Sequence, residues 1–183
     1  SAEIIRMLNS AFDAFAKHPE RDYCPVDLMK EIEAVNERVY KTLNNGVYKS
    51  GFARSQEAYN AAVTDLFETM GWLEDRLSRQ SYLAGDRITE ADWRLFTTLL
   101  RFDPVYHGHF KCNIRRLIDY PNLWNYTREL YQVPGITSTI NHQHIKTHYY
   151  GSHASLNPTG VVPKGPDIDF AAPHDRGRLN VSA

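Results

Sequence analysis

The apolar residues of this chain recur every three or four positions, which is the period of an amphipathic α-helix. The pattern predicts a first helix over about residues 2–16 and a second over about 26–44, which closes at Asn44-Asn45-Gly46. A connector is expected over 47–53, because asparagine and glycine tolerate the positive φ of a helix-ending turn. No segment alternates apolar and polar residues with period two, so the sequence predicts an all-helical protein.

One helix has a well-marked start. The Thr89 hydroxyl can accept a hydrogen bond from the Asp92 amide, while the Asp92 carboxylate reaches back to the Thr89 amide, as in a capping box. Ile88 and Trp93 occupy the two positions of a hydrophobic staple. A helix over about 90–101 is therefore expected to begin at a fixed residue, and this motif concerns folding rather than catalysis.

Four further helices are expected, over about 55–78, 113–119, 122–132 and 136–149. Ser55 is the expected cap of the first of these. From residue 154 onward, repeated proline and glycine accompany few large apolar residues, so the end of the chain cannot form a core of its own. The sequence thus predicts a bundle of about six to eight helices. The tail either packs on this bundle or extends from it.

Composition and charge exclude several classes of protein. A chain of 183 residues with 42% hydrophobic content can bury one sizeable core. Its 21 basic and 22 acidic residues give no electrostatic reason to expect nucleic acid or an anionic membrane as partner. No apolar run approaches the roughly 20 residues of a membrane span, and Cys24 and Cys112 are too few for a disulfide scaffold. A cytoplasmic setting is expected.

The segment 144–158 combines more ionisable and hydrogen-bonding side chains than a structural helix needs: His144, His148, Tyr149, Tyr150 and His153. His144 and His148 would share a helical face, which could suggest a zinc site. No acidic third ligand of the kind found in a His-Glu-x-x-His motif accompanies them, so no metal is expected.

Neither cysteine is the expected nucleophile. Cys24 precedes Pro25 at a helix start, where amide dipoles lower the pKa of a thiol, but no resolving cysteine or preceding strand accompanies it. Cys112 follows the cation Lys111, yet it fits better as a small buried hydrophobic residue. The nucleophile of an enzyme would have to come from elsewhere.

Several tyrosines fall at helix ends or connectors, where a phenol can hydrogen-bond to a thiolate or exchange a proton with an aromatic alcohol: Tyr40, Tyr48, Tyr106, Tyr149 and Tyr150. Tyr59 and Tyr126 instead fit helical stripes and are predicted to pack. From the residues alone, a structural role is more common than catalysis for each of these tyrosines, because a buried phenol usually donates a hydrogen bond to a backbone carbonyl.

Several strings of this sequence carry a family resemblance: Asn44 to Ala53, the capping box Ile88 to Phe96, Arg101-Phe102-Asp103-Pro104-Val105-Tyr106, His109-Phe110-Lys111-Cys112-Asn113 and His144 to Pro158. Over nearly the whole chain they resemble the glutathionyl-hydroquinone reductases, the Xi class of glutathione transferases. The resemblance implies a glutathione-transferase C-terminal-like helical bundle over 18–153, followed by a tail over 154–183. Residues 1–17 would be the last helix of a thioredoxin-like domain that is otherwise missing.

The same resemblance implies a chemistry. In this family a cysteine of the thioredoxin-like domain attacks the sulfur of a glutathionyl-hydroquinone, the hydroquinone leaves, and a second glutathione releases oxidised glutathione. By resemblance, Tyr48 would move the proton, while Tyr106 and Tyr149 would stabilise the thiolate. Ser1 would contact glutathione at a helix N-terminus. Residues expected to bind the substrate or to support the site are Tyr150, His144, His148 and His153.

The implied partners are glutathione, as co-substrate, and a glutathionylated aromatic hydroquinone, and the resemblance also implies a homodimer through the helical domain. Because the cysteine would lie in the missing domain, this chain alone is expected to be inactive. The alternative is a non-catalytic, glutathione-transferase-like scaffold for binding or dimerisation. A scaffold does not need polar tyrosines directed into a cleft, so Tyr48, Tyr106 and Tyr149 favour the enzyme.

Overall fold

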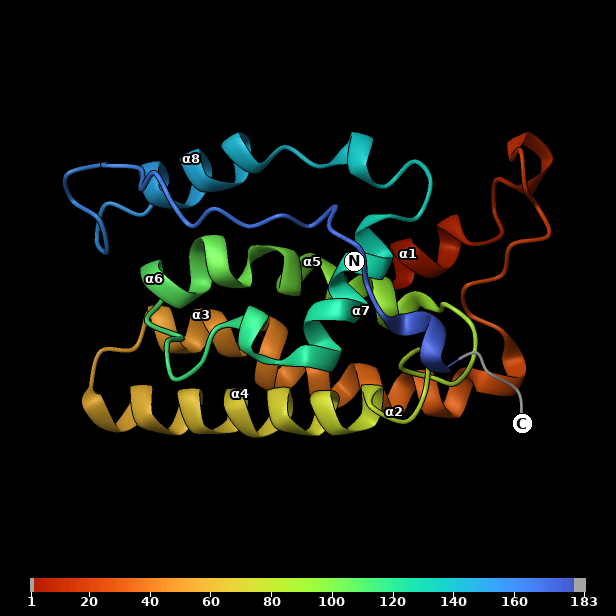
Figure 1. The fold of residues 1–183 in the computed structure, drawn as a ribbon, viewed down its shortest axis with the longest axis horizontal. Helices are drawn as coiled ribbons and strands as arrows, with labels where there is room; N and C mark the ends of the chain where they lie inside the picture. The colour runs from red at the N-terminus through yellow and green to blue at the C-terminus, as the bar shows by residue number, and fades with distance from the viewer. Residues whose placement is uncertain (1, 180–183) are drawn as a thin grey trace.

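The computed structural model describes residues 2–179, which form an all-helical bundle without a β-strand, as the sequence predicts (Figure 1). Its α-helices are α1 (Ala2–Leu8), α2 (Met29–Val39), α3 (Gly46–Gly51), α4 (Gln56–Leu77), α5 (Glu90–Arg101), α6 (His107–His109), α7 (Pro121–Tyr131) and α8 (His142–Ser152). Short 3₁₀ turns occur at Asp13–Phe15, Val26–Leu28, Leu117–Asp119, Thr137–Thr139 and Arg176–Leu179. None of the described helices has the length and apolar character that crossing a membrane requires.

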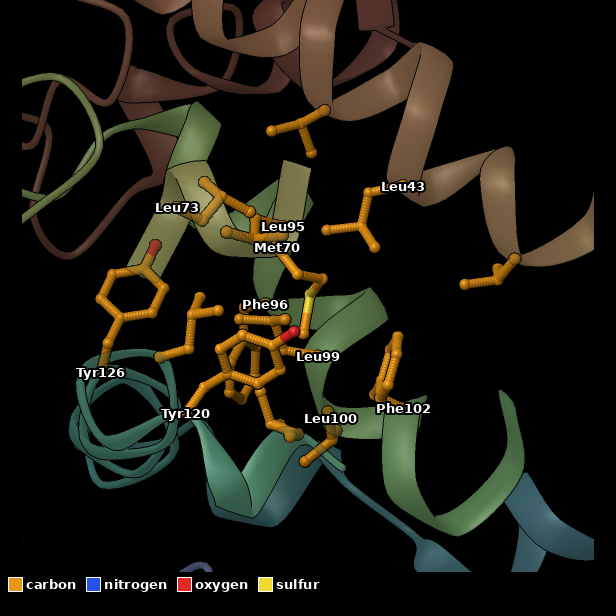
Figure 2. Close-up of a cluster of buried hydrophobic side chains, with 14 of the residues drawn as sticks. Leu43, Met70, Leu73, Leu95, Phe96, Leu99, Leu100, Phe102, Tyr120 and Tyr126 are labelled. Carbon is orange, nitrogen blue, oxygen red and sulfur yellow. The ribbon is translucent and has the colours of Figure 1, made fainter. Parts of the chain in front are cut away.

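The core lies between the long helix α4 and the helices that pack against it. In Figure 1, α4 runs along one side of the bundle and α8 along the opposite side, with α3, α5 and α6 between them. Figure 2 shows Leu43, Met70, Leu95 and Leu99 gathered in one buried cluster, and each of these side chains is inaccessible to solvent. The apolar stripes that predicted the helices are therefore the surfaces that join them.

Two helix starts form as expected. The Ser55 hydroxyl caps α4 by accepting a hydrogen bond from the Ala58 amide at 3.1 Å. At the start of α5, the Asp92 carboxylate accepts from the Thr89 amide at 2.7 Å. The capping box of Thr89 and Asp92 is thus present, as the sequence predicts, and the Thr89 hydroxyl also donates to this carboxylate at 3.0 Å.

Asp92 also connects α5 to the rest of the core. Its buried carboxylate accepts hydrogen bonds from the Leu83 amide at 2.9 Å and from the Tyr126 hydroxyl at 2.7 Å. Tyr126 is completely buried, so its phenol has a structural role, in agreement with its place on a helical stripe. Asp92, a member of the capping box of α5, thus joins this helix to α7 and to the loop that precedes α5.

Two wide π turns replace expected helix ends. The first, Tyr40–Asn44, continues α2 directly into α3, and the Asn45 amide donates to the Tyr40 carbonyl at 3.0 Å. Asn45 has a φ of −85°, so the helix does not end there, and the connector expected over 47–53 is instead largely the helix α3. The second, Phe102–Tyr106, links α5 to α6.

The second π turn contains Pro104. Proline has no N–H to donate within a helix, and its ring clashes with the carbonyl four residues earlier. A wider turn accommodates both constraints, and such turns often mark functional sites. The sequence pattern of period three and four cannot reveal either π turn, because each inserts an extra residue.

Three helices are shorter than expected. α1 ends at Leu8 rather than near residue 16, and the segment 113–119 contains only the 3₁₀ turn Leu117–Asp119. The apolar side chains of α1 are exposed, so little packing stabilises a longer helix. α8 begins at His142 instead of 136, because the Asn141 side chain caps it by accepting from the His144 amide at 2.9 Å.

The described part of the tail runs back along the bundle beside α8 (Figure 1). Phe170 is buried, and its ring stacks on Tyr131 and His142 with centroids 5.4 and 5.3 Å away. The Arg176 side chain is only 1% exposed and donates to the Leu77 carbonyl, at the end of α4, at 2.5 Å. Nothing in the composition of the tail points to a buried arginine that secures it.

Candidate active site

Three tyrosine hydroxyls from distant parts of the chain meet in the structure. Tyr48 lies in α3, Tyr106 ends the second π turn, and Tyr149 lies in α8. The Tyr149 oxygen is 2.6 Å from the Tyr48 oxygen and 3.0 Å from the Tyr106 oxygen. The structure therefore brings together the residues expected to be catalytic. We call these three residues the phenol cluster.

Burial keeps the inner members of the phenol cluster protonated. Tyr106 and Tyr149 are buried, and this burial raises the pKa of Tyr149 to about 12. Burial, followed by the neighbouring Tyr149 phenol, raises the pKa of Tyr106 well above its usual value. Both side chains are therefore neutral hydrogen-bond donors at physiological pH.

The phenol cluster has one hydroxyl hydrogen more than it uses internally. Each phenol has one hydrogen, and the three oxygens are joined by two hydrogen bonds. Tyr48 is the exposed member, at 38%, whereas Tyr106 is 3% exposed. If Tyr106 donates to Tyr149, and Tyr149 to Tyr48, the remaining hydrogen lies on Tyr48, where a ligand can accept it.

Close packing behind the phenols determines their positions. The Phe110 ring stacks on Tyr106 with centroids 5.6 Å apart and contacts the Tyr48 ring at 5.2 Å. Phe110 presses against Gly51, where an added Cβ would lie 2.8 Å from the Phe110 Cβ. A glycine in α3 therefore permits the ring that supports both tyrosines. The Asn44 amide donates to the Thr98 hydroxyl at 2.6 Å and joins the first π turn to α5.

The phenol cluster lines a cavity of about 570 Å³. Its remaining walls come from α1, the first π turn and α5: Ile5, Tyr40, Asn44, Trp93, Arg94, Thr97, Thr98 and Arg101. The polar residues of α5 were not among the residues predicted for the site. A signal was present, because Arg94, Thr97, Thr98 and Arg101 recur at three and four along an otherwise well-buried amphipathic helix.

The other predicted residues lie around this cavity in different ways. The rings of His148 and His153 lie 5.3 and 5.6 Å from the Tyr149 ring, and His153 Nδ1 is 3.1 Å from His109 Nε2. His144 lines a neighbouring cavity and Tyr150 lines a third, so neither lines the cavity of the phenol cluster. Ser1 lies outside the described residues, so its contact with glutathione stays a prediction.

The two thiols have the properties of poor nucleophiles. Cys112 is buried, and burial raises the pKa of its thiol to about 12. Burial, followed by the charge of Glu90, also raises the pKa of Cys24. A protonated thiol is unreactive at neutral pH. Among residues 2–179, no group of three or more His, Cys, Asp or Glu side chains is placed to hold a metal ion.

Comparison with known proteins places this chain in a class. Residues 56–129 match the family model described as the C-terminal domain of glutathione S-transferase. The glutathionyl-hydroquinone reductase PcpF of Sphingobium chlorophenolicum is 58% identical over 166 residues, which are 91% of this chain and 53% of that protein. YqjG of Escherichia coli, another glutathionyl-hydroquinone reductase, is 52% identical over 96% of this chain and 53% of its own length. The chain thus spans about half the length of these curated relatives.

Solved structures agree in fold. The glutathione-bound structure of YqjG superposes with a TM-score of 0.93 over 96% of this chain and 57% of that chain, at 52% identity. A Xi-class glutathione transferase from Natrialba magadii superposes with a TM-score of 0.94 over 97% of this chain and 54% of its own, at 47% identity. The fold is that of a glutathione transferase C-terminal domain. Within that class, the chain belongs to the family of the glutathionyl-hydroquinone reductases, the Xi class.

Proposed function

We propose that this chain forms the aromatic-substrate-binding part of a glutathione-dependent reductase that converts glutathionyl-hydroquinones to hydroquinones. The observation that carries the proposal is the phenol cluster, three hydrogen-bonded tyrosines at the wall of a cavity large enough for an aromatic ring. The names of the relatives and the glutathione-bound structure of YqjG support glutathione as the co-substrate. Ser1 is the glutathione contact proposed within this chain.

We further propose that the catalytic cysteine belongs to a thioredoxin-like domain outside these 183 residues. The match to a C-terminal domain and the span of about half the relatives' length support this division. Residues 1–17 would then be the last helix of that domain, residues 18–153 the helical domain, and residues 154–183 its tail. The raised pKa values of Cys24 and Cys112 fit a nucleophile that comes from elsewhere.

The proposed reaction has two sulfur exchanges. The cysteine thiolate attacks the sulfur of the glutathionyl-hydroquinone, a disulfide to glutathione forms, and the bond between sulfur and ring carbon breaks. The electron pair stays on the ring carbon, which takes a proton, and the hydroquinone leaves. The thiolate of a second glutathione then attacks the mixed disulfide, which forms oxidised glutathione and frees the cysteine.

The geometry supports a division of labour among the tyrosines. Tyr48 is the exposed phenol and would give its proton to the ring carbon, because its hydrogen is not needed within the cluster. A phenolate then forms on Tyr48, and a hydrogen bond from Tyr149 would stabilise that anion. Before attack, Tyr106 and Tyr149 would turn their hydroxyl hydrogens from the cluster to the cysteine sulfur and stabilise the thiolate, and they would return to the cluster bonds once that sulfur is in the disulfide. His148 and His153 would hold the Tyr149 ring in place from behind.

The test is turnover of glutathionyl-hydroquinone by the longer protein that contains this chain. Tyr48→Phe should reduce kcat by about 10²- to 10⁴-fold, the usual effect of losing a general acid, and Tyr106→Phe and Tyr149→Phe should also reduce it. Tyr59→Phe is the matched control, because its hydroxyl donates to the Lys111 carbonyl at 2.7 Å, away from the phenol cluster. Wild-type rates in all three cluster variants would refute the assignment.

Two further measurements separate the alternatives. The 183-residue chain alone should not turn over the substrate, and robust activity from it would overturn the proposed location of the cysteine. Inactivity of the longer protein as well would favour the non-catalytic scaffold for binding or dimerisation. We also propose a homodimer through the helical domain, which light scattering at several protein concentrations would test.

A further inference from the structure

A second cavity, of about 450 Å³, adjoins the first along α5. Trp93, Thr97 and Arg101 line both cavities. These residues are four apart in the sequence, so they form one stripe on the helix surface. The other walls of the second cavity are mainly apolar and include Phe96, Leu100, Ile136, Ile140 and Ile145. The two cavities therefore adjoin along this stripe of α5, and we call them together the cleft.

The charge of this cleft is positive although the chain as a whole has a net charge of −1. No aspartate or glutamate is among the described residues that line either cavity, whereas Arg94 and Arg101 both line the first. The Arg94 guanidinium lies 3.8 Å from the buried carboxylate of Glu90, which offsets its charge.

Arg101 has no such partner. In the described part of the chain, its guanidinium makes a single hydrogen bond, from Nη1 to the Thr97 carbonyl at 2.7 Å, and no carboxylate lies within 4.0 Å. Four of its five N–H donors are therefore uncommitted. The Arg101 charge also reaches the phenol cluster, since it opposes the rise in the pKa of Tyr149 that burial causes.

We propose that Arg101 binds a carboxylate of the substrate in this cleft and so favours acidic aromatic substrates. The inference rests on the proposed function, because it places the reacting ring beside the phenol cluster. A guanidinium matches a carboxylate with two parallel hydrogen bonds. Trp93 and the apolar second cavity would hold the body of the substrate, while a carboxylate on its ring would face Arg101. A carboxylate of glutathione has the same chemistry and is the other possible source.

The proposal can be tested by comparing how acids and their matched esters bind to the 183-residue chain. Binding is measured by the quenching of tryptophan fluorescence. The ring probes are 2,5-dihydroxybenzoate and its methyl ester, and the peptide probes are glutathione and its glycyl ethyl ester. The wild type should bind the acid of one pair about tenfold more tightly than its ester, as expected for one charge-assisted contact. A preference within the ring pair supports selection of acidic aromatic substrates, whereas a preference within the peptide pair alone would assign the carboxylate to glutathione and overturn that selectivity.

Arg101→Gln should bind the acid and the ester equally, because glutamine keeps polarity but has no charge. Arg54→Gln is the control, since Arg54 is exposed and lines neither cavity. Equal binding of acid and ester by the wild type, or an unchanged preference in Arg101→Gln, would overturn the carboxylate site. Ring binding without an acid preference would leave the proposed function intact. The two proposals can also fail separately in the other direction. If the tyrosine variants keep wild-type turnover while the preference for the acid over its ester depends on Arg101, only the tyrosine chemistry is refuted.

Discussion

Replacement of Arg176 by methionine should cause a large loss of stability, because this arginine secures the tail to the end of α4. Its guanidinium donates to the carbonyls of Leu77, Gln80 and Ser81, and its Nε lies 3.4 Å from a carboxylate oxygen of Glu129. α4 ends at Leu77, so the Leu77 carbonyl belongs to the last turn of a helix and has no intrahelical partner, while Gln80 and Ser81 lie in the loop that follows. Methionine fills a similar space but donates no hydrogen bond.

The magnitude follows from what the substitution leaves behind. Glu129 is only 14% exposed at its side chain, and removal of one partner from a buried ion pair typically costs about 3–5 kcal/mol. The carbonyls that lose a charged donor add to this cost, although Tyr82 still donates to Glu129 at 3.1 Å. We therefore expect the free energy of unfolding to fall by about 3–5 kcal/mol in Arg176→Met.

Equilibrium unfolding in urea, with Arg178→Met as the matched control, checks this value. Arg178 lies two residues away, but its side chain is 41% exposed and pairs with Asp175 at the surface. Such a pair contributes about 0–1 kcal/mol. The same loss in both variants, or a loss below about 1 kcal/mol in Arg176→Met, would show that the tail is not secured by this residue.

Two other predictions concern the supports of the phenol cluster. Gly51→Ala should lower the free energy of unfolding by about 1–3 kcal/mol, because the added Cβ would collide with Phe110. Gly71→Ala in α4 is the control: it has open space around it and should raise the free energy of unfolding by about 0.5–1 kcal/mol. Urea midpoints that shift in the same direction in both variants would contradict this. Burial raises the pKa of Tyr149 to about 12, so the folded state retains this proton longer than the unfolded chain. Stability should accordingly decline as the pH rises from about 10 toward about 12, and less steeply in Tyr149→Phe. Parallel declines in the two proteins would exclude Tyr149 as the cause.

Local sequence patterns predicted the parts of this protein that depend on local physics. The period of the apolar residues indicated the helical class, and Ser55 and Thr89 marked helix starts that the structure contains. The two residues of a capping hydrogen bond lie within one helical turn of each other, so both can be recognised in a short stretch of sequence. The resemblance to a family named the three tyrosines, although it did not indicate how they are joined.

The arrangement of the site depends on contacts between residues far apart in the chain. Tyr48 and Tyr149 are separated by 101 positions, and their hydroxyls meet only after two π turns and the packing of α8 have placed them. The burial of Arg176 depends likewise on carbonyls more than 90 residues earlier. Periodicity describes which face of a helix is buried, but the register and direction in which faces meet follow from side-chain packing across the whole core. The long helices could therefore be predicted from the sequence, whereas α3 and the two π turns could not. The phenol cluster, the cleft along α5 and the anchored tail are properties of the tertiary structure.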